Sequence, residues 1–248
     1  MGFAMYTLKN DHDTDFFLRG LESLDIQLSD EQIHQFLAFY EMLIKKNKVM
    51  NLTAITDFED VVVKHFLDSL CISRVLNLTS CMSVIDLGTG AGFPGIPLKI
   101  AYPEIHITLA DSLNKRILFL NDVINELSLD KISTVHSRAE EMGRDKKYRE
   151  HFDICVSRAV ANLSVLCEYC LPLIKEGGFF ISYKSADYEH ETEQAERSIQ
   201  ILGGKIECTE VFQIPGSAVG RSLIKIKKIK QTPKAYPRKP GIPGKNPL

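Results

Sequence analysis

The sequence predicts an α/β fold built on a doubly wound, mostly parallel sheet of seven strands, of the Rossmann-like kind. Two observations support this prediction. From Ser83 onward, short apolar runs alternate with helical patterns, as they do when helices cover both faces of a parallel sheet. The first apolar run also breaks abruptly into a glycine-rich turn and then resumes as an apolar helix. We expect three parts: an N-terminal helical cap (1–80), the core (81–229) and a basic, Pro-rich tail (230–248).

The cap is expected to contain two helices. We expect residues 1–13 to be frayed. The first helix begins at Ser29, whose hydroxyl can cap it while Gln32 completes a capping box. A second helix follows Asp57, with 61–76 as its body. His65 and Asp68 lie one turn apart on it, where they either pair and face the glycine turn or only make structural hydrogen bonds. Apolar residues at helical spacing define the first helix: Ile33, Phe36, Leu37, Tyr40, Leu43 and Ile44.

The core is expected to alternate strands with helices up to a terminal hairpin. Two strands joined by a short loop, 215–220, predict an antiparallel edge on the otherwise parallel sheet. The expected strands are 84–87, 105–110, 132–136, 152–156, 179–183, 206–214 and 221–226. The expected helices are 96–102, 115–127, 163–174 and about 187–202.

Composition fits an ordinary globular protein, because 44% of the 248 residues are hydrophobic and 25% are charged. The sequence has no apolar run of membrane-spanning length and starts without a secretory signal pattern, so we expect a cytoplasmic protein with no membrane partner. We also expect a monomer.

Six cysteines lack the spacing of a disulfide framework, so we expect reduced thiols. Cys167 and Cys170 form one C-x-x-C pair, whereas a structural zinc ion would require a second pair or nearby histidines. We interpret the pair as packing on a helix face and expect no metal site.

Charge is distributed unevenly along the chain. The formal net charge is −2, but the segment from Lys225 to Leu248 has eight Lys or Arg and no Asp or Glu. Subtracting these eight positive charges leaves −10 for the rest of the chain. A basic end on an acidic body is typical of proteins that bind a phosphate-rich partner, and a solubilising tail is the alternative.

The glycine turn indicates a nucleotide-type cofactor. Its glycines permit positive φ and a close approach of a ligand to backbone N–H groups. Gly90, Gly92 and Gly95 match the dinucleotide pattern G-x-G-x-x-G. Asp86 and Gly88 extend the match to D-x-G-x-G-x-G, the pattern of S-adenosylmethionine (SAM) methyltransferases, so the second pattern uses more of the turn. In either case, an acid at the end of the next strand, Asp111, can bind the ribose hydroxyls.

The end of the fourth strand bears on the reaction. Ligands of open parallel sheets bind beyond the carboxyl ends of the strands, so Arg158 in Ser157-Arg158-Ala159 should point into the site. There it can hold a ligand or stack on a base, and a structural ion pair is the alternative. The motif contains neither a cysteine nucleophile nor the Asn/Asp-Pro-Pro-aromatic pattern of amine methylation. An acceptor such as guanine N7 needs only placement, because its lone pair is already nucleophilic.

Several ordered motifs closely resemble the RsmG (GidB) family of bacterial methyltransferases, which methylate N7 of a guanine in small-subunit ribosomal RNA. The similarity runs from about residue 15 to the end of the chain. Its motifs are Asn51-Leu52-Thr53-Ala54, His65-Phe66-Leu67-Asp68-Ser69, the glycine turn, Asp111-Ser112-Leu113-Asn114-Lys115-Arg116, Ser157-Arg158-Ala159 and the tail 232–241.

The resemblance implies a class I SAM-dependent methyltransferase and assigns residues to its site. Gly88, Gly90 and Phe93 would contact SAM, and Asp111 its ribose. Ala139 and Glu140 would bind the adenosine end, and Arg158 the cofactor or the guanine beside it. Arg138, Lys184 and Arg221 would bind RNA, as free ribosomal RNA or as the small ribosomal subunit.

Two other classes of function stay open at this point. One is an NAD-dependent oxidoreductase, although the chain has no room for a second, substrate-binding domain. The other is a non-catalytic RNA-binding factor in ribosome assembly, which would bind the cofactor without transferring a methyl group.

Overall fold

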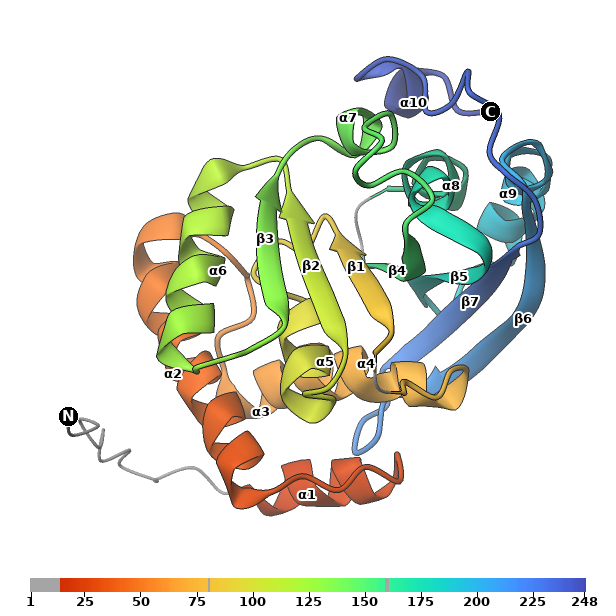
Figure 1. Cartoon of the computed structure of the whole chain (residues 1–248). Coiled ribbons are helices and arrows are strands. Elements are labelled where there is room, and N and C mark those ends of the chain that lie inside the picture. Colours follow the sequence, from red (N-terminus) through yellow and green to blue (C-terminus); the bar gives the residue numbers. More distant parts are fainter. Residues whose placement is uncertain (1–13, 80, 159–160) are drawn as a thin grey trace.

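A single seven-stranded sheet organises the chain, in the order β3-β2-β1-β4-β5-β7-β6 (Figure 1). The computed structural model describes residues 14–79, 81–158 and 161–248. Neighbours from β3 to β5 are parallel, and β7 pairs antiparallel with both β5 and β6. The predicted doubly wound sheet and its antiparallel hairpin are therefore confirmed. The strands are β1 (Ser83–Leu87), β2 (His106–Asp111), β3 (Ile132–His136), β4 (Phe152–Arg158), β5 (Ile174–Ser185), β6 (Gly204–Gln213) and β7 (Gly220–Lys228).

Helices cover both faces of the sheet and enclose two apolar cores. Because side chains alternate along a strand, Val84 of β1 enters one core and Ile85 the other. The first core lies beneath the cap helices, α5 and α6, and the second beneath α8 and α9. Both thiols of the C-x-x-C pair, Cys167 and Cys170, are fully buried in this second core, as expected for packing on a helix face. The core helices are α5 (Gly95–Ala101), α6 (Asn114–Glu126), α7 (Ala139–Met142), α8 (Leu163–Cys170) and α9 (Glu189–Ile201).

The cap follows the predicted pattern with one addition. Helix α2 (Asp30–Met50) begins with the expected capping box, in which Ser29 accepts from the backbone N–H of Gln32 and Gln32 accepts from that of Ser29. The addition is α1 (Asp15–Glu22), which was not predicted although Phe17, Gly20 and Leu21 are buried at helical spacing. The expected frayed segment, 1–13, lies outside the described residues.

The second cap helix is irregular where a uniform helix was expected. After Asp57 caps α3 (Phe58–Val61), the chain forms a π-helical turn, η1 (Val62–Leu67), then α4 (Asp68–Leu70) and a 3₁₀ turn, η2 (Cys71–Arg74). π-Helical turns within helices are frequent at functional sites. This one directs the backbone and side chains of 64–68 toward the end of β4.

Other boundaries differ slightly from those expected. The segment after α8 tightens into a 3₁₀ turn, η3 (Leu171–Leu173), and β5 begins at Ile174, before the two glycines expected to open it. The C-terminal stretch after β7 lies along α7 and α8 and ends in α10 (Ile242–Lys245) (Figure 1). No helix among the described residues is both long and apolar enough to cross a membrane.

Candidate functional site

A cleft of about 580 Å³ opens at the carboxyl ends of β1, β2 and β4. Strands β2 and β3 are added on one side of β1, and β4 and β5 on the other side. Open α/β sheets bind ligands where the order of strands reverses in this way. Of the ten site residues predicted from the sequence, eight line the cleft: Gly88, Gly90, Phe93, Asp111, Arg138, Ala139, Glu140 and Arg158.

The glycine turn forms the floor of the cleft. Gly88, Gly90 and Gly92 all have positive φ, between 63° and 103°. A Cβ on Gly90 would meet no atom closer than 3.9 Å, so the space beside it is open to a ligand. A Cβ on Gly95 would instead lie 2.2 Å from Leu109 Cδ2. Gly90 is therefore open toward the cleft, whereas Gly95 is needed for packing of α5 on β2.

Asp86 holds this turn from below. Its Oδ2 accepts hydrogen bonds from Thr89 Oγ1 (2.6 Å) and from the backbone N–H of Gly95 (2.8 Å). Burial raises the pKa of this carboxyl to about 6, against the opposing effect of the two hydrogen bonds. Asp86 does not line the cleft. The acid of the D-x-G-x-G-x-G pattern thus shapes the turn here rather than facing the ligand.

Asp111 lies at the end of β2, as the sequence predicted, and is 3% exposed. Its Oδ2 accepts from Gly90 N–H (3.0 Å) and pairs with Arg116 (3.1 Å), while Oδ1 accepts from Leu113 N–H (2.9 Å). Arg116 had no predicted role. Its position in the first turn of α6, five residues after the acid, was the available signal.

The side of the cleft next to α7 involves a contact that the sequence did not indicate. Glu140, in α7, is 6% exposed, and its Oε1 accepts a hydrogen bond from the backbone N–H of Gly241 (3.0 Å). Burial first, and then the charges of Glu140 and Glu168, raise the pKa of the neighbouring Tyr169 to about 12. Both Tyr169 and Gly241 line the cleft. The C-terminal segment therefore forms part of its wall.

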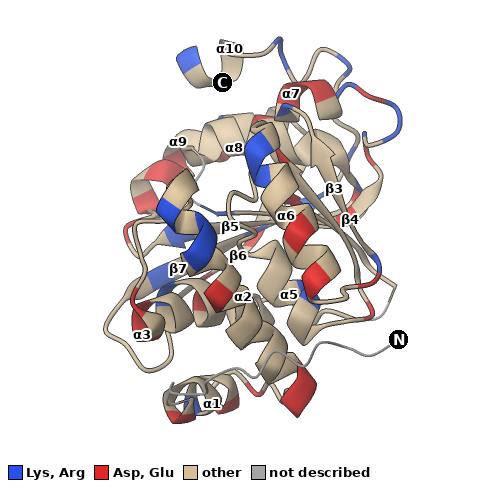
Figure 2. Ribbon diagram, turned by 90° about the vertical axis from the view of Figure 1, so that its left-hand side faces the viewer, with Lys and Arg blue, Asp and Glu red and all other residues tan. Residues whose placement is uncertain are grey.

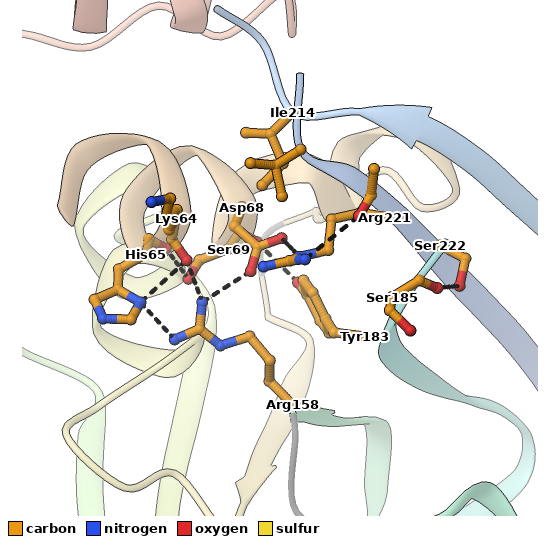
Figure 3. A network of polar contacts seen from close by, with 12 residues as sticks. Lys64, His65, Asp68, Ser69, Arg158, Tyr183, Ser185, Ile214, Arg221 and Ser222 are labelled. Carbon is orange, nitrogen blue, oxygen red and sulfur yellow. Dashed lines mark hydrogen bonds and ion pairs between the residues drawn. The ribbon is translucent and has the colours of Figure 1, made fainter. Parts of the chain in front are cut away.

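Arg158 lies at the opposite side of the cleft, within a polar network (Figure 3). One guanidinium nitrogen, Nη1, donates to Asp68 Oδ2 and to the carbonyl of Lys64, both at 2.9 Å. The other, Nη2, lies 3.1 Å from His65 Nδ1, and the guanidinium carbon lies 5.0 Å from the centre of the Phe93 ring. Arg158 thus makes the structural ion pair that was the alternative interpretation and also lines the cleft. Ala159 of its motif lies outside the described residues.

His65 and Asp68 are linked through Arg158, and no direct bond between them is found in the described part of the chain. The His65 ring stacks on Phe93 with centroids 4.5 Å apart, and its Nε2 lies 2.9 Å from Thr53 Oγ1. Burial, and next the charge of Arg158, lowers the pKa of His65 to about 3. The ring is therefore neutral near pH 7, and both of its nitrogens are engaged: Nδ1 lies 3.0 Å from the Lys64 carbonyl as well as beside Arg158, and Nε2 lies beside Thr53 Oγ1.

Lys184 and Arg221, predicted to bind RNA, do not line the cleft. Lys184 pairs with Glu191 at 2.6 Å and donates to the carbonyl of Ala161, and only 9% of its side chain is exposed. Arg221 Nε donates to Asp68 Oδ1 at 3.1 Å, so Asp68 lies between two arginines. Both side chains are thus held by internal contacts, and their role toward RNA stays a prediction.

Comparison with known proteins gives a family. A family model described as rRNA small subunit methyltransferase G (GidB) matches residues 32–218, about three quarters of the chain. The chain belongs to this family.

Curated relatives of the methyltransferase G family match over nearly their whole length. The chain is 52% identical to the ribosomal RNA small subunit methyltransferase G of Lachnoclostridium phytofermentans, over 95% of this chain and 98% of the relative. It is also 52% identical to the protein of the same name from Acetivibrio thermocellus, over 93% of this chain and 95% of the relative. The dehydrogenase alternative is therefore wrong, and the chain is a SAM-dependent ribosomal RNA methyltransferase of this family.

Solved structures show the same fold at low sequence identity. TrmN from Thermus thermophilus aligns with a TM-score of 0.51 and 14% identity, over 68% of this chain and 53% of that one. The YcgJ protein from Bacillus subtilis aligns with a TM-score of 0.51 and 12% identity, over 67% of this chain and all of that one. The fold is that of class I SAM-dependent methyltransferases.

The cleft offers features that suit SAM, the cofactor of this family. The open space beside Gly90 allows a ligand to approach the backbone, as a Cβ would not. Asp111 offers a carboxylate at the strand end where a ribose is expected. Wall residues on the α7 side, including Tyr169, can enclose a base. The described residues therefore fit the cofactor, with the arginine network at the other end of the cleft.

Proposed function

We propose that the chain methylates N7 of a guanine in small-subunit ribosomal RNA. The resemblance stated for the sequence motifs supports this proposal, and so does the chemistry available beside Arg158. SAM, when bound, supplies an electrophilic methyl group on a sulfonium. The acceptor atom must be one that can take this methyl group without a general base from the protein.

The observation that carries the proposal is the lack of a free proton acceptor among the described residues beside Arg158. His65 is neutral, but both of its ring nitrogens are engaged, Nδ1 by Arg158 and the Lys64 carbonyl and Nε2 by Thr53. Asp68 is 1% exposed, and both its oxygens bind arginines. An exocyclic amine must lose a proton on methylation, whereas guanine N7 has none to lose. The acceptor that fits this site is therefore a ring nitrogen with a lone pair.

Arg158 can orient such a base. A guanidinium has five N–H donors, and the contacts to Asp68, Lys64 and His65 use three of them. A remaining donor can bind guanine O6, which lies beside N7 on the same edge of the base. The pairing with Asp68 fixes the guanidinium plane and offsets its charge. We therefore assign Arg158 the role of holding the base while N7 stays free for the methyl group.

Basic residues at the rim of the cleft suit a phosphate-rich substrate. Arg138 is exposed at the N-terminus of α7, and Arg116 lies in the first turn of α6 with about a third of its side chain exposed. Figure 2 shows Lys and Arg at the end of α6 nearest α7 and in the segment around α10. A ribosomal RNA substrate would place the reaction in the bacterial cytoplasm, on free RNA or on the small subunit.

The test is methyl transfer from labelled SAM to small ribosomal subunits that lack their own modification, followed by mapping of alkali-labile 7-methylguanosine. We expect label at one guanine of the small-subunit RNA. Label at another atom or on another RNA would contradict the proposal. SAM binding without transfer to any RNA would instead favour the non-catalytic assembly factor.

A further inference from the structure

The C-terminal segment 229–248, which we call the strap, follows the surface of the core instead of extending from it. In Figure 1 it runs from the end of β7 past α8 and reaches α10 close to α7. One of its residues, Gly241, lines the cleft, and Pro237 and Pro243 are buried. Three sets of contacts hold the strap along this path.

The first set fixes the start of the strap. Lys228, at the end of β7, is fully buried, and its Nζ donates to the Leu171 carbonyl (2.5 Å) and to Thr232 Oγ1 (2.6 Å). Thr232 in turn donates from Oγ1 to the Leu202 carbonyl and from its backbone N–H to Glu150 Oε1. The chain is therefore attached to the core on both sides of residue 230.

The second set fixes the middle of the strap through its backbone. Two arginines that follow α7 in the chain donate hydrogen bonds to carbonyl oxygens of the strap. Arg149 binds the carbonyls of Thr232 (2.7 Å) and Tyr236 (2.8 Å), and Arg144 binds that of Pro237 (2.8 Å). These contacts depend on the position of the strap's backbone and not on its charged side chains.

The third set is an ion pair between Arg238 of the strap and Glu168 of α8. Arg238 donates from Nη2 to Glu168 Oε2 (2.6 Å) and from Nε to Oε1 (2.9 Å), and its backbone N–H also binds Oε1 (2.7 Å). Glu168 is 1% exposed. Bidentate pairs of this kind fix geometry as well as charge. Because Glu168 neutralises it, Arg238 is committed to the core rather than to an RNA phosphate.

Three residues after Arg238, the strap reaches the edge of the cleft. Gly241, in the left-handed conformation (φ 81°), donates its backbone N–H to Glu140 Oε1 at the edge of the cleft. We propose that the strap is a wall of the SAM site, in which Arg238 is a positioning residue that, through Gly241, holds Glu140 toward the adenosine end of the cofactor. This inference rests on the proposed assignment of Glu140 to that end.

The neighbour of Arg238 provides a matched control. Lys239 is exposed and has no ion-pair partner in the part of the chain that the structure describes. Arg238→Ala and Lys239→Ala remove the same charge one residue apart, but only the first removes an anchor. If the strap acts only through its charge, the two variants should behave alike.

The experiment is calorimetric titration of the full-length protein with SAM in the absence of RNA. We expect Arg238→Ala to raise the Kd for SAM at least tenfold and Lys239→Ala to leave it unchanged within twofold. In methylation assays, Arg238→Ala should raise KM for SAM while kcat at saturating SAM stays within about twofold, and Arg238→Lys should recover part of the affinity.

A second variant covers the case in which Arg238→Ala fails to fold because it leaves Glu168 buried and unpaired. A chain ending after Pro240 keeps the ion pair but removes Gly241, and we expect the same loss of SAM affinity. If SAM affinity is unchanged in this variant and equal in the two alanine variants, the strap proposal is overturned while the proposed function stands. If the wild-type protein itself does not bind SAM, the proposed function fails first.

Discussion

At the scale of single residues, Asp68 is a buried carboxylate between two arginines. It is 1% exposed and receives Arg158 on one oxygen and Arg221 on the other. Removing the charge of one partner in a buried pair is costly because the other charges stay buried. Asp68 therefore joins the end of β4, the terminal hairpin and the cap.

We predict that Asp68→Asn lowers the free energy of unfolding by about 3 kcal/mol, because two partly buried guanidinium groups lose their counter-ion. Urea unfolding monitored by circular dichroism would measure this loss of stability. Asp60→Asn is the matched control on the same cap segment: Asp60 pairs with Lys64 but is about half exposed, so its loss should cost less than about 0.5 kcal/mol. Equal losses for the two variants would mean that the Asp68 network contributes no more than a surface ion pair.

The second residue-scale prediction concerns the ionisation of His65. Because burial and Arg158 lower its pKa to about 3, the ring should stay neutral throughout pH 5–8. The folded pKa lies below the usual value of about 6.5, so its contribution to stability is complete above pH 6.5 and is lost as the pH falls toward 3. Nitrogen NMR of labelled histidine should show no titration of the His65 ring between pH 5 and 8. A titration midpoint near pH 6.5 would refute the neutral ring, hydrogen-bonded at both nitrogens, on which the proposed acceptor chemistry depends.

At the scale of elements, the glycine turn separates two requirements that the sequence pattern combines. Gly95 is packed tightly against Leu109 and Asp86, whereas the space beside Gly90 is open. Gly95 is therefore required by the packing of the fold, whereas Gly90 leaves room for a ligand.

We predict opposite effects of alanine at these two positions. Gly95→Ala should lower the free energy of unfolding by about 3 kcal/mol, because the new Cβ overlaps with Leu109 in a closed core. Gly90→Ala should cost only about 1 kcal/mol, from its positive φ, but should weaken SAM binding at least tenfold. Thermal unfolding and calorimetry with SAM would measure the two quantities. Retention of wild-type SAM affinity in Gly90→Ala would show that the cofactor does not approach the turn there.

The elements that the sequence predicted well are those with a strong local pattern. Strands β1 to β4 and helix α6 follow from their periods to within about two residues, and the capping box located the start of α2. The π-helical turn could not be predicted, because its sequence has the period of an ordinary helix and its surroundings come from distant parts of the chain, such as Arg158, which donates to the Lys64 carbonyl. The network that it supports joins residues 93 positions apart, Arg158 and His65, and 153 apart, Arg221 and Asp68. Contacts of such separation leave no signal in a local pattern.

At the scale of the whole molecule, the basic C-terminal region contains two kinds of charge, those that internal acids neutralise and those that stay exposed. Three of its eight basic residues are committed to internal acids: Lys225 to Glu207, Lys228 to Glu150 and Arg238 to Glu168. Composition could predict a basic end but not which charges the fold neutralises. A deletion starting at Lys225, where the basic run begins, would cut through β7, which pairs with β5 and β6 up to Lys228. Such a deletion would test the fold rather than RNA binding.

The charges available to RNA are the exposed lysines of the strap. They have no ion-pair partner within the described ranges, and they are Lys230, Lys234, Lys239 and Lys245. We predict that changing all four to alanine, with Arg238 retained, reduces the slope of log affinity for small-subunit RNA against log salt by about 3, because each phosphate contact contributes roughly 0.7–0.9. Filter binding at several salt concentrations would measure the slope, and calorimetry should find SAM affinity unchanged. An unchanged slope would mean that the strap faces away from RNA. Loss of SAM affinity in this variant would instead show that its lysines, and not only its anchors, support the cofactor site.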